Sequence, residues 1–146
     1  MKKIESLWLV VLCLWQFPQF IVGTILWLFL GKTELIESRH FNYCFKGEKM
    51  RGGISLGPLC FVSPQMSKFP THVAHELDGH TKDSLIFGPL YLVFIGIPSI
   101  LWAMTYRLGN SCYYKFYTER WANRHAGLIV VDDCELMFKK TMNFGK

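Results

Sequence analysis

Residues 73–84 read VAHELDGHTKDS, and the spacing of the histidines in this stretch decides how the chain around it folds. His75 and His80 are five residues apart. On a regular helix of 3.6 residues per turn, that spacing separates two side chains by about 140°. A helix widened by one residue, a π-bulge, brings both side chains to one face, and Gly79 makes that distortion easy. Whether His75 and His80 meet therefore depends on a local departure from α-helical geometry.

The same residues resemble a zinc-binding signature. In the H-E-x-x-H motif, two histidines four residues apart bind one zinc ion, and the glutamate beside the first histidine acts as general base. The six residues HELDGH fit the longer motif H-E-x-x-G-H, which is typical of the dipeptidyl peptidase III family of zinc exopeptidases. This resemblance covers six residues only. It implies that His75 and His80 bind Zn2+ and that Glu76 is the catalytic residue.

Two other interpretations of the segment stay open. His72, Glu76 and His80 follow one another at intervals of four residues, so they form one stripe along an undistorted helix. Neighbouring members of that stripe would bind a metal while His75 points elsewhere. In the other interpretation the histidines are solvated polar side chains that bind no metal.

A catalytic zinc ion usually takes three protein ligands and a water molecule. We favour Glu119 as the third ligand, because the H-E-x-x-H…E class of peptidases, which this segment resembles, uses a glutamate from a later helix. The alternative is a surface interaction of Glu119 with Asn123 or Arg124. We expect Asp83 to be a surface or helix-pairing charge and His125 to lie at a helix C-terminus. The remaining candidates that follow His80 are Asp132, Asp133 and Glu135.

Two long apolar segments flank the histidines. Residues 7–30, LWLVVLCLWQFPQFIVGTILWLFL, contain no charge, and residues 85–106 form a second uncharged run. A transmembrane helix needs about 20 apolar residues, so both segments are long enough to span a bilayer. The chain of 146 residues is short enough for one domain, residues 1–146. The sequence therefore predicts a mainly α integral membrane protein whose surroundings are a lipid bilayer.

The remaining elements are shorter. Glycines alternate with β-branched and apolar pieces over residues 40–63, which predicts a small β-hairpin or meander with strands at Tyr43 to Phe45 and Ile54 to Val62. Residues 71–84 are expected to form the helix that carries the histidines, beside the membrane. Residues 111–126 have the pattern of a C-terminal amphipathic helix that ends at Gly127, and a short strand is expected at residues 128–131.

The first apolar segment contains residues that do not suit a straight helix in lipid. Pro18 removes one helical hydrogen bond and predicts a kink. The carbonyl that it frees, and the amides of Gln16 and Gln19, need polar partners within the bilayer. We therefore expect this face of the segment to pack on protein.

The second apolar segment is interrupted by Gly88-Pro89 and by GIPS at residues 96–99. A straight helix over residues 85–106 would be about 30 Å long and would put Glu119 and His80 on opposite sides of the membrane. The interruptions allow the segment to be broken or to turn back as a re-entrant hairpin. Alternatively, the amphipathic helix folds back into the bilayer region. Either arrangement returns Glu119 to the side of His80.

Charge and cysteine content exclude other classes of protein. The net charge is +5, but Lys and Arg are scattered, which fits flanks of membrane segments and indicates no nucleic-acid partner. The number of cysteines is odd and none forms a C-x-x-C pair, which argues against a disulfide framework or a zinc ribbon. They are Cys13, Cys44, Cys60, Cys112 and Cys134.

A wider resemblance covers about half of the chain. The blocks WQFPQ, GGISLG, GHTKDS, FGPLYLVFIGIPS and FYTERWANRHAG are similar, in order and spacing, to a family of small bacterial integral-membrane proteins. Members of that family carry H-E-x-G-H where this chain has one residue more, with Leu77-Asp78-Gly79 in place of two residues. Either a bulge absorbs the insertion or the site is degenerate. The resemblance implies a metallopeptidase in the bacterial cytoplasmic membrane.

These observations predict a membrane-bound zinc metallopeptidase that hydrolyses a peptide or a membrane-protein substrate at the membrane surface. Zinc would be bound by His75, His80 and Glu119, and Glu76 would transfer protons. The alternative is a non-catalytic membrane protein that packs against a partner and has a degenerate or merely metal-binding histidine site.

Overall fold

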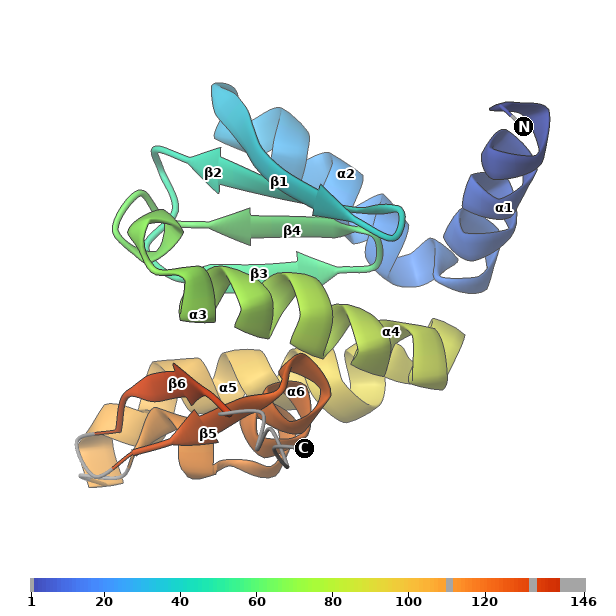
Figure 1. Ribbon diagram of the computed structural model, residues 1–146. Coiled ribbons are helices and arrows are strands. Elements are labelled where there is room, and N and C mark those ends of the chain that lie inside the picture. Colours follow the sequence, from blue (N-terminus) through green and yellow to red (C-terminus); the bar gives the residue numbers. More distant parts are fainter. Residues whose placement is uncertain (1, 110–111, 132–133, 140–146) are drawn as a thin grey trace, which may run out of the picture.

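The molecule is built in layers, with a small sheet between helices (Figure 1). The computed structural model describes residues 2–109, 112–131 and 134–139. Helix α2 (Phe17–Leu30) packs on one face of the sheet, and a helical stretch over residues 70–87 packs on the other. Helices α5 (Ile97–Thr105) and α6 (Tyr117–Ala126) lie beyond that stretch. The predicted combination of many helices with a small β element is therefore confirmed.

The N-terminal apolar segment is bent. Helix α1 (Lys2–Trp15) and α2 meet at Gln16 at an angle of 98°, with Pro18 in the first turn of α2. The predicted kink is present, but the single helix expected for this segment is wrong. Gln16 and Gln19 are buried and share one partner, because Ser84 Oγ donates to Gln16 Oε1 (2.5 Å) and accepts from Gln19 Nε2 (2.9 Å). Both amides thus have the protein partners that the sequence predicts.

Among the described residues, no single helix combines the length and the apolar composition needed to cross a bilayer. By these two criteria α1 and α2 qualify only together, as a bent pair. The helical stretch Leu92–Thr105 is apolar but shorter. Both segments predicted to be long enough to span, residues 7–30 and 85–106, are thus divided in the structure.

The sheet is larger than the predicted hairpin. Its strand order is β1-β2-β4-β3, and β2 and β4 are parallel whereas the other pairs are antiparallel. The small β element expected over residues 40–63 is present. The expected strand Tyr43 to Phe45 lies within β2, but the expected strand Ile54 to Val62 is divided into β3 and β4, and β1 extends the sheet. The strands are β1 (Thr33–Arg39), β2 (Asn42–Gly47), β3 (Gly53–Leu56) and β4 (Leu59–Val62).

Strand β4, with the sequence LCFV, joins two hydrophobic cores. All four residues are buried, because helices cover both faces of the sheet. Leu59 and Phe61 pack in the cluster that includes Leu30 of α2. Cys60 and Val62 pack in the cluster on the opposite face, which belongs to the helical stretch 70–87. Because successive side chains of β4 point to opposite faces of the sheet, Cys60 and Val62 form the surface on which the helical stretch 70–87 packs.

The helical stretch contains the predicted bulge. It consists of α3 (Pro70–Ala74), a π-helical turn η2 (His75–His80) and α4 (Thr81–Phe87). The predicted helix over residues 71–84 is confirmed with slightly wider bounds. Helix α6 lies so close to the π-turn that a Cβ atom on Gly79 would be 2.5 Å from the main-chain oxygen of Ala122. Gly79 is therefore needed for the contact between the two helices.

The second apolar segment is broken where Gly88 stands. Gly88 has a φ of 52°, and the chain continues through the short helix η3 (Gly88–Leu90) and the π-turn η4 (Leu92–Gly96) into α5. Figure 1 shows α5 beneath the stretch that contains α3 and α4. The predicted break is thus present. It lets the chain return so that α6 packs on η2.

The C-terminal part is a short helix and a hairpin. The short helices η5 (Tyr106–Gly109) and η6 (Tyr113–Lys115) precede α6. The amphipathic helix predicted over residues 111–126 is therefore too long at its N-terminal end. The expected strand at residues 128–131 is present as β5 (Leu128–Val130), which pairs with β6 (Leu136–Phe138).

We predict that Gly79→Ala destabilises the protein by about 1–3 kcal/mol, the usual effect of overpacking, because its methyl group would collide with the backbone of α6. The measurement is chemical or thermal unfolding of the purified protein. Gly52→Ala is the matched control, since a Cβ atom at Gly52 would meet nothing within 4 Å. Equal stability of the two variants would contradict the close packing of η2 on α6.

Candidate metal centre

Three predicted ligand side chains converge between η2 and α6. Oε2 of Glu119 lies 2.8 Å from Nε2 of His75 and 3.3 Å from Nε2 of His80. Each residue offers one ligand atom, and these atoms all lie within 4.8 Å of one another. The structure thus brings together the three residues that the sequence singled out as metal ligands.

The π-turn is the reason that the two histidines meet. His75 and His80 are its first and last residues, and their rings lie 4.9 Å apart, edge to face. On a regular helix the two side chains would point about 140° apart. The five-residue interval between the two histidines is therefore accommodated by the local geometry of the helix.

The three groups are almost completely buried. Glu119 is 0% exposed, His75 is 2% and His80 is 4%. A surface interaction of Glu119 is thereby excluded. Burial alone would lower the pKa of His80, but the carboxylates of Glu119 and Asp83 outweigh burial and hold it well above its ordinary value. Burial alone would raise the pKa of Glu119, and the two histidines instead hold it well below its ordinary value.

Polar side chains lie close to the outer nitrogen of each ring, although Nδ1 of His80 and both carboxylate oxygens of Asp83 have no hydrogen-bond partner among the described residues. Nδ1 of His75 lies 2.7 Å from Oδ1 of Asn123 on α6. Nδ1 of His80 lies 3.4 Å from Oδ2 of Asp83, whose Oδ1 lies 2.8 Å from Nδ1 of His125. Asp83 is fully buried and its partner His125 belongs to α6, so of the two expectations for Asp83 the helix-pairing charge is the one observed and the surface charge is not. Carboxylates and amides in these positions orient metal-binding histidines, because they leave Nε2 free to face the ion.

The second oxygen of Glu119 is also held. Ser99 Oγ donates to Oε1 over 2.6 Å, and Thr118 Oγ1 lies 3.1 Å from the same atom. Ser99 belongs to α5, so the broken apolar segment contributes to the site. Oε2 is consequently the oxygen that is available to the two histidines.

Glu76 lies beside this cluster and not in it. Ser55 Oγ, from β3, is 2.7 Å from Oε2 of Glu76 and 2.9 Å from its main-chain oxygen. A Cβ atom at Gly53 would be 2.5 Å from Oε1 of Glu76, so any larger residue there would displace the Glu76 carboxylate. Glu76 lines a cavity of about 270 Å³ together with His80. Its carboxylate is therefore next to the cluster and in contact with an open space.

The cluster offers a donor set that could hold a metal ion, and its distances can be compared with those around a tetrahedral zinc ion. Two ligand atoms that are each about 2.0–2.1 Å from a tetrahedral ion lie about 3.3–3.4 Å apart. The distance from His80 Nε2 to Glu119 Oε2, 3.3 Å, has this value. The distance from His75 Nε2 to the same oxygen, 2.8 Å, is shorter and is that of a hydrogen bond. Two neutral imidazoles and one carboxylate are also a donor set that zinc commonly takes in catalytic sites.

The remaining candidates lie apart from the cluster. Nδ1 of His72 is 3.0 Å from the hydroxyl oxygen of Tyr114, and the π-turn directs His80 toward His75 instead. The stripe of His72, Glu76 and His80 is therefore not the arrangement in the structure. Glu135 lines a different cavity, near the C-terminal hairpin. Asp132 and Asp133 lie outside the described residues.

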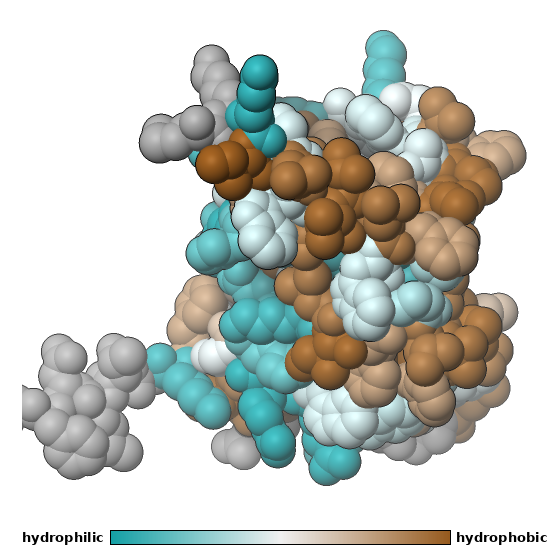
Figure 2. All heavy atoms as spheres, turned by 90° about the vertical axis from the view of Figure 1, so that its right-hand side faces the viewer, coloured by the Kyte–Doolittle hydropathy of each residue, from teal (hydrophilic) through white to brown (hydrophobic). Residues whose placement is uncertain are grey.

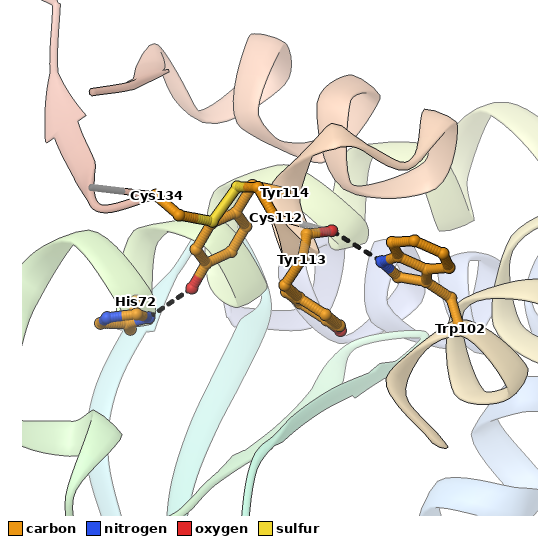
Figure 3. Close-up of a disulfide and its surroundings, with 6 residues drawn as sticks. All are labelled: His72, Trp102, Cys112, Tyr113, Tyr114 and Cys134. Carbon is orange, nitrogen blue, oxygen red and sulfur yellow. Dashed lines mark hydrogen bonds between the residues drawn. A yellow bond between two sulfur atoms is a disulfide. The ribbon is translucent and has the colours of Figure 1, made fainter. Parts of the chain in front are cut away.

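A disulfide supports the loop that covers the site. Cys112 and Cys134 are bonded, with their Cα atoms 5.6 Å apart, and the bond joins η6 to the C-terminal hairpin (Figure 3). The adjacent Tyr114 contacts both His72 and the ring of His75. The argument against a disulfide framework therefore missed one bond, while Cys13, Cys44 and Cys60 are free thiols.

Several polar residues around the cluster were not identified as part of the site from the sequence. Ser55, Ser99 and Asn123 are common polar residues, and each comes from a different element of the fold. Their positions depend on tertiary packing, which no local spacing reveals. The block FYTERWANRHAG did place Asn123 one helical turn after Glu119, so a shared helix face was available as a signal.

No family model, curated protein or solved structure shows a significant match to this chain.

We predict that the purified protein binds about one zinc ion per chain and loses it in His75→Ala, His80→Ala and Glu119→Gln. His72→Ala is the matched control and should retain zinc, because the ring of His72 is hydrogen-bonded to Tyr114 and lies outside the cluster. The measurement is metal analysis by mass spectrometry after purification in zinc-containing buffer. If His72→Ala loses zinc while His75→Ala retains it, the cluster is not the metal site.

We also predict that the double substitution Cys112→Ser and Cys134→Ser lowers the free energy of unfolding by about 2–4 kcal/mol, because the bond restricts the unfolded chain. Thermal unfolding with and without a reducing agent measures this effect. Cys13→Ser is the control, since Cys13 is a free thiol. A wild-type transition that is insensitive to reduction would argue against the bond.

Proposed function

We propose that the protein is a membrane-associated zinc peptidase. The observation that carries the proposal is the convergence of His75, His80 and Glu119 beside a cavity that Glu76 also lines. The order of these residues in the chain, H-E-x-x-G-H followed by a glutamate on a later helix, supports the same reaction.

Zinc would be held by Nε2 of each histidine and by a carboxylate oxygen of Glu119. A zinc ion in such a site lowers the pKa of a water molecule and polarises a carbonyl group. Asn123 and Asp83 would keep the imidazoles in the required orientation. Ser99 would do the same for Glu119.

Glu76 would act as the proton carrier. Its carboxylate takes a proton from the attacking water as the oxygen of that water bonds to the carbonyl carbon of the substrate. When the carbon–nitrogen bond breaks, the same proton passes to the leaving nitrogen, which departs as a neutral amine. Ser55 holds Oε2 of Glu76, so the orientation of the carboxylate is fixed before the substrate binds.

The membrane part of the proposal rests on exposed apolar side chains. Figure 2 looks onto the face that carries α1, and hydrophobic side chains cover much of it, while hydrophilic ones gather along one side. An exposed apolar surface of this extent is typical of contact with a membrane or with another protein. Large apolar side chains that are more than half exposed include Leu7, Trp8, Leu14, Leu28, Phe29, Val93, Leu101 and Met104.

A non-catalytic role is the second candidate, and one observation favours it. The carboxylate of Glu119 is satisfied without a metal, because it is in contact with both histidines and with Ser99. Such a network by itself stabilises the contact between η2 and α6. Zinc content and the dependence of hydrolysis on Glu76 separate the two roles.

We predict that Glu76→Gln retains zinc and folds normally but hydrolyses peptides about 10²–10⁴ times more slowly, because the amide cannot carry the proton. The measurement is the cleavage of a panel of quenched fluorescent peptides by the detergent-purified protein. Glu48→Gln, in the turn between β2 and β3, is the control and should cleave them at the wild-type rate. Equal cleavage by the wild type and Glu76→Gln would remove Glu76 from the mechanism.

A further inference from the structure

Two cavities meet at Glu76. The first, of about 270 Å³, lies between β3, α2 and α5, and the second, of about 280 Å³, lies on the side of His72 and His75. Gly53, Ala103 and Tyr113 line both cavities, as does Glu76 itself. The proposed proton carrier therefore stands at the junction of two separate spaces.

The two cavities differ in chemistry. The first is lined mainly by aliphatic side chains, and the second by aromatic and basic ones. Aliphatic lining residues of the first include Val22, Leu56, Leu92, Ile97 and Ile100. Lining residues of the second include Arg51, His72, Tyr106 and Tyr114. A chain that passed through both would therefore meet an apolar environment on one side of Glu76 and a polar one on the other.

The mouth of the first cavity belongs to the exposed apolar surface. Val22 is 43% exposed, Ile97 is 54% and Ile100 is 46%, although each of them also lines the cavity. These residues come from α2 and α5, and the other exposed residues of these two helices are apolar except for Thr105. At the second cavity, the exposed lining residues are Arg51 and Ala103, and the guanidinium of Arg51 requires water.

We propose that the substrate is a peptide with an apolar segment followed or preceded by a polar one, and that cleavage falls at the boundary between them. The first cavity would receive an apolar side chain that enters from lipid, and the second would receive the polar stretch. This inference rests on the proposed peptidase function and adds the class of substrate. A volume of about 270 Å³ is near the lower end of ligand pockets, about 300–1,000 Å³, so the cavity suits one or two side chains.

The test uses zinc-loaded Glu76→Gln protein and two fluorescent peptides of identical composition. In the first peptide the apolar residues form one block beside a polar block, and in the second they are dispersed. We expect the block peptide to bind at least about tenfold more tightly, the preference that one well-filled apolar pocket gives. Equal affinity for the two peptides would overturn the inference.

Two neighbouring substitutions on α5 locate the preference. Ile100→Trp fills the mouth of the first cavity and should abolish the preference for the block peptide. Leu101→Trp is the matched control, because Leu101 is 57% exposed and does not line the cavity. Zinc content, measured for both variants, verifies that the site is intact. Identical behaviour of the two variants would overturn the assignment of the cavity.

Cleavage by the wild type separates this inference from the function on which it rests. If the wild type cleaves both peptides equally well and Glu76→Gln cleaves neither, the peptidase stands and the substrate class is wrong. If the block peptide binds selectively, Ile100→Trp abolishes this selectivity, and the wild type does not cleave the peptide, then the proposed peptidase function is wrong and the binding site stands.

Discussion

The wide turn of helix between His75 and His80 is the feature on which the rest of the structure depends. It rotates His80 back toward His75 and leaves Leu77, between them, fully buried against the sheet. A regular helix could not bring the two histidines together while burying Leu77, since His75 and His80 would then point in different directions. The packing of α6 depends on the same turn, because Gly79 has no side chain and the backbone of α6 can therefore approach closely at this residue. One π-turn thus fixes the core beneath it and the polar cluster above it.

The cluster shows how a buried carboxylate is tolerated. Taking Glu119 out of water is unfavourable by several kcal/mol unless partners replace the lost hydration. Here two imidazoles, a serine and a threonine surround it, and they come from η2, α5 and α6. The same partners would hold the carboxylate in place for a cation. Stability of the helix packing and readiness for metal binding therefore have one physical origin.

Local spacing predicted the parts of the structure that local geometry controls. The bulge followed from the five-residue interval and Gly79, the break followed from Gly88-Pro89, and the partners of Gln16 followed from the polarity of an amide in an apolar segment. Glu119 was predicted from its resemblance to a class of peptidases and not from geometry.

Contacts between segments that are distant in the chain could not be predicted from the sequence. The parallel pairing of β2 with β4 requires a crossover that no local pattern records. Cys112 and Cys134 are 22 residues apart, so their pairing depends on how the C-terminal hairpin folds back. The right-angled bend at Gln16 was underestimated, because a proline kink alone does not explain 98° and the contacts that hold the bend come from Ser84 and Gly88.

That bend has a consequence for the order of events during synthesis. Gln19 is separated from Ser84 by 65 residues and from Gly88 by 69, so its hydrogen bonds close very large loops. Contacts of such high sequence separation form late in folding, because the entropy of loop closure opposes them. While residues 84–88 are still inside the ribosome, nothing holds the bend, and residues 7–30 emerge as one continuous apolar run. The nascent chain would therefore expose a long apolar run before the contacts that stabilise its bend can form.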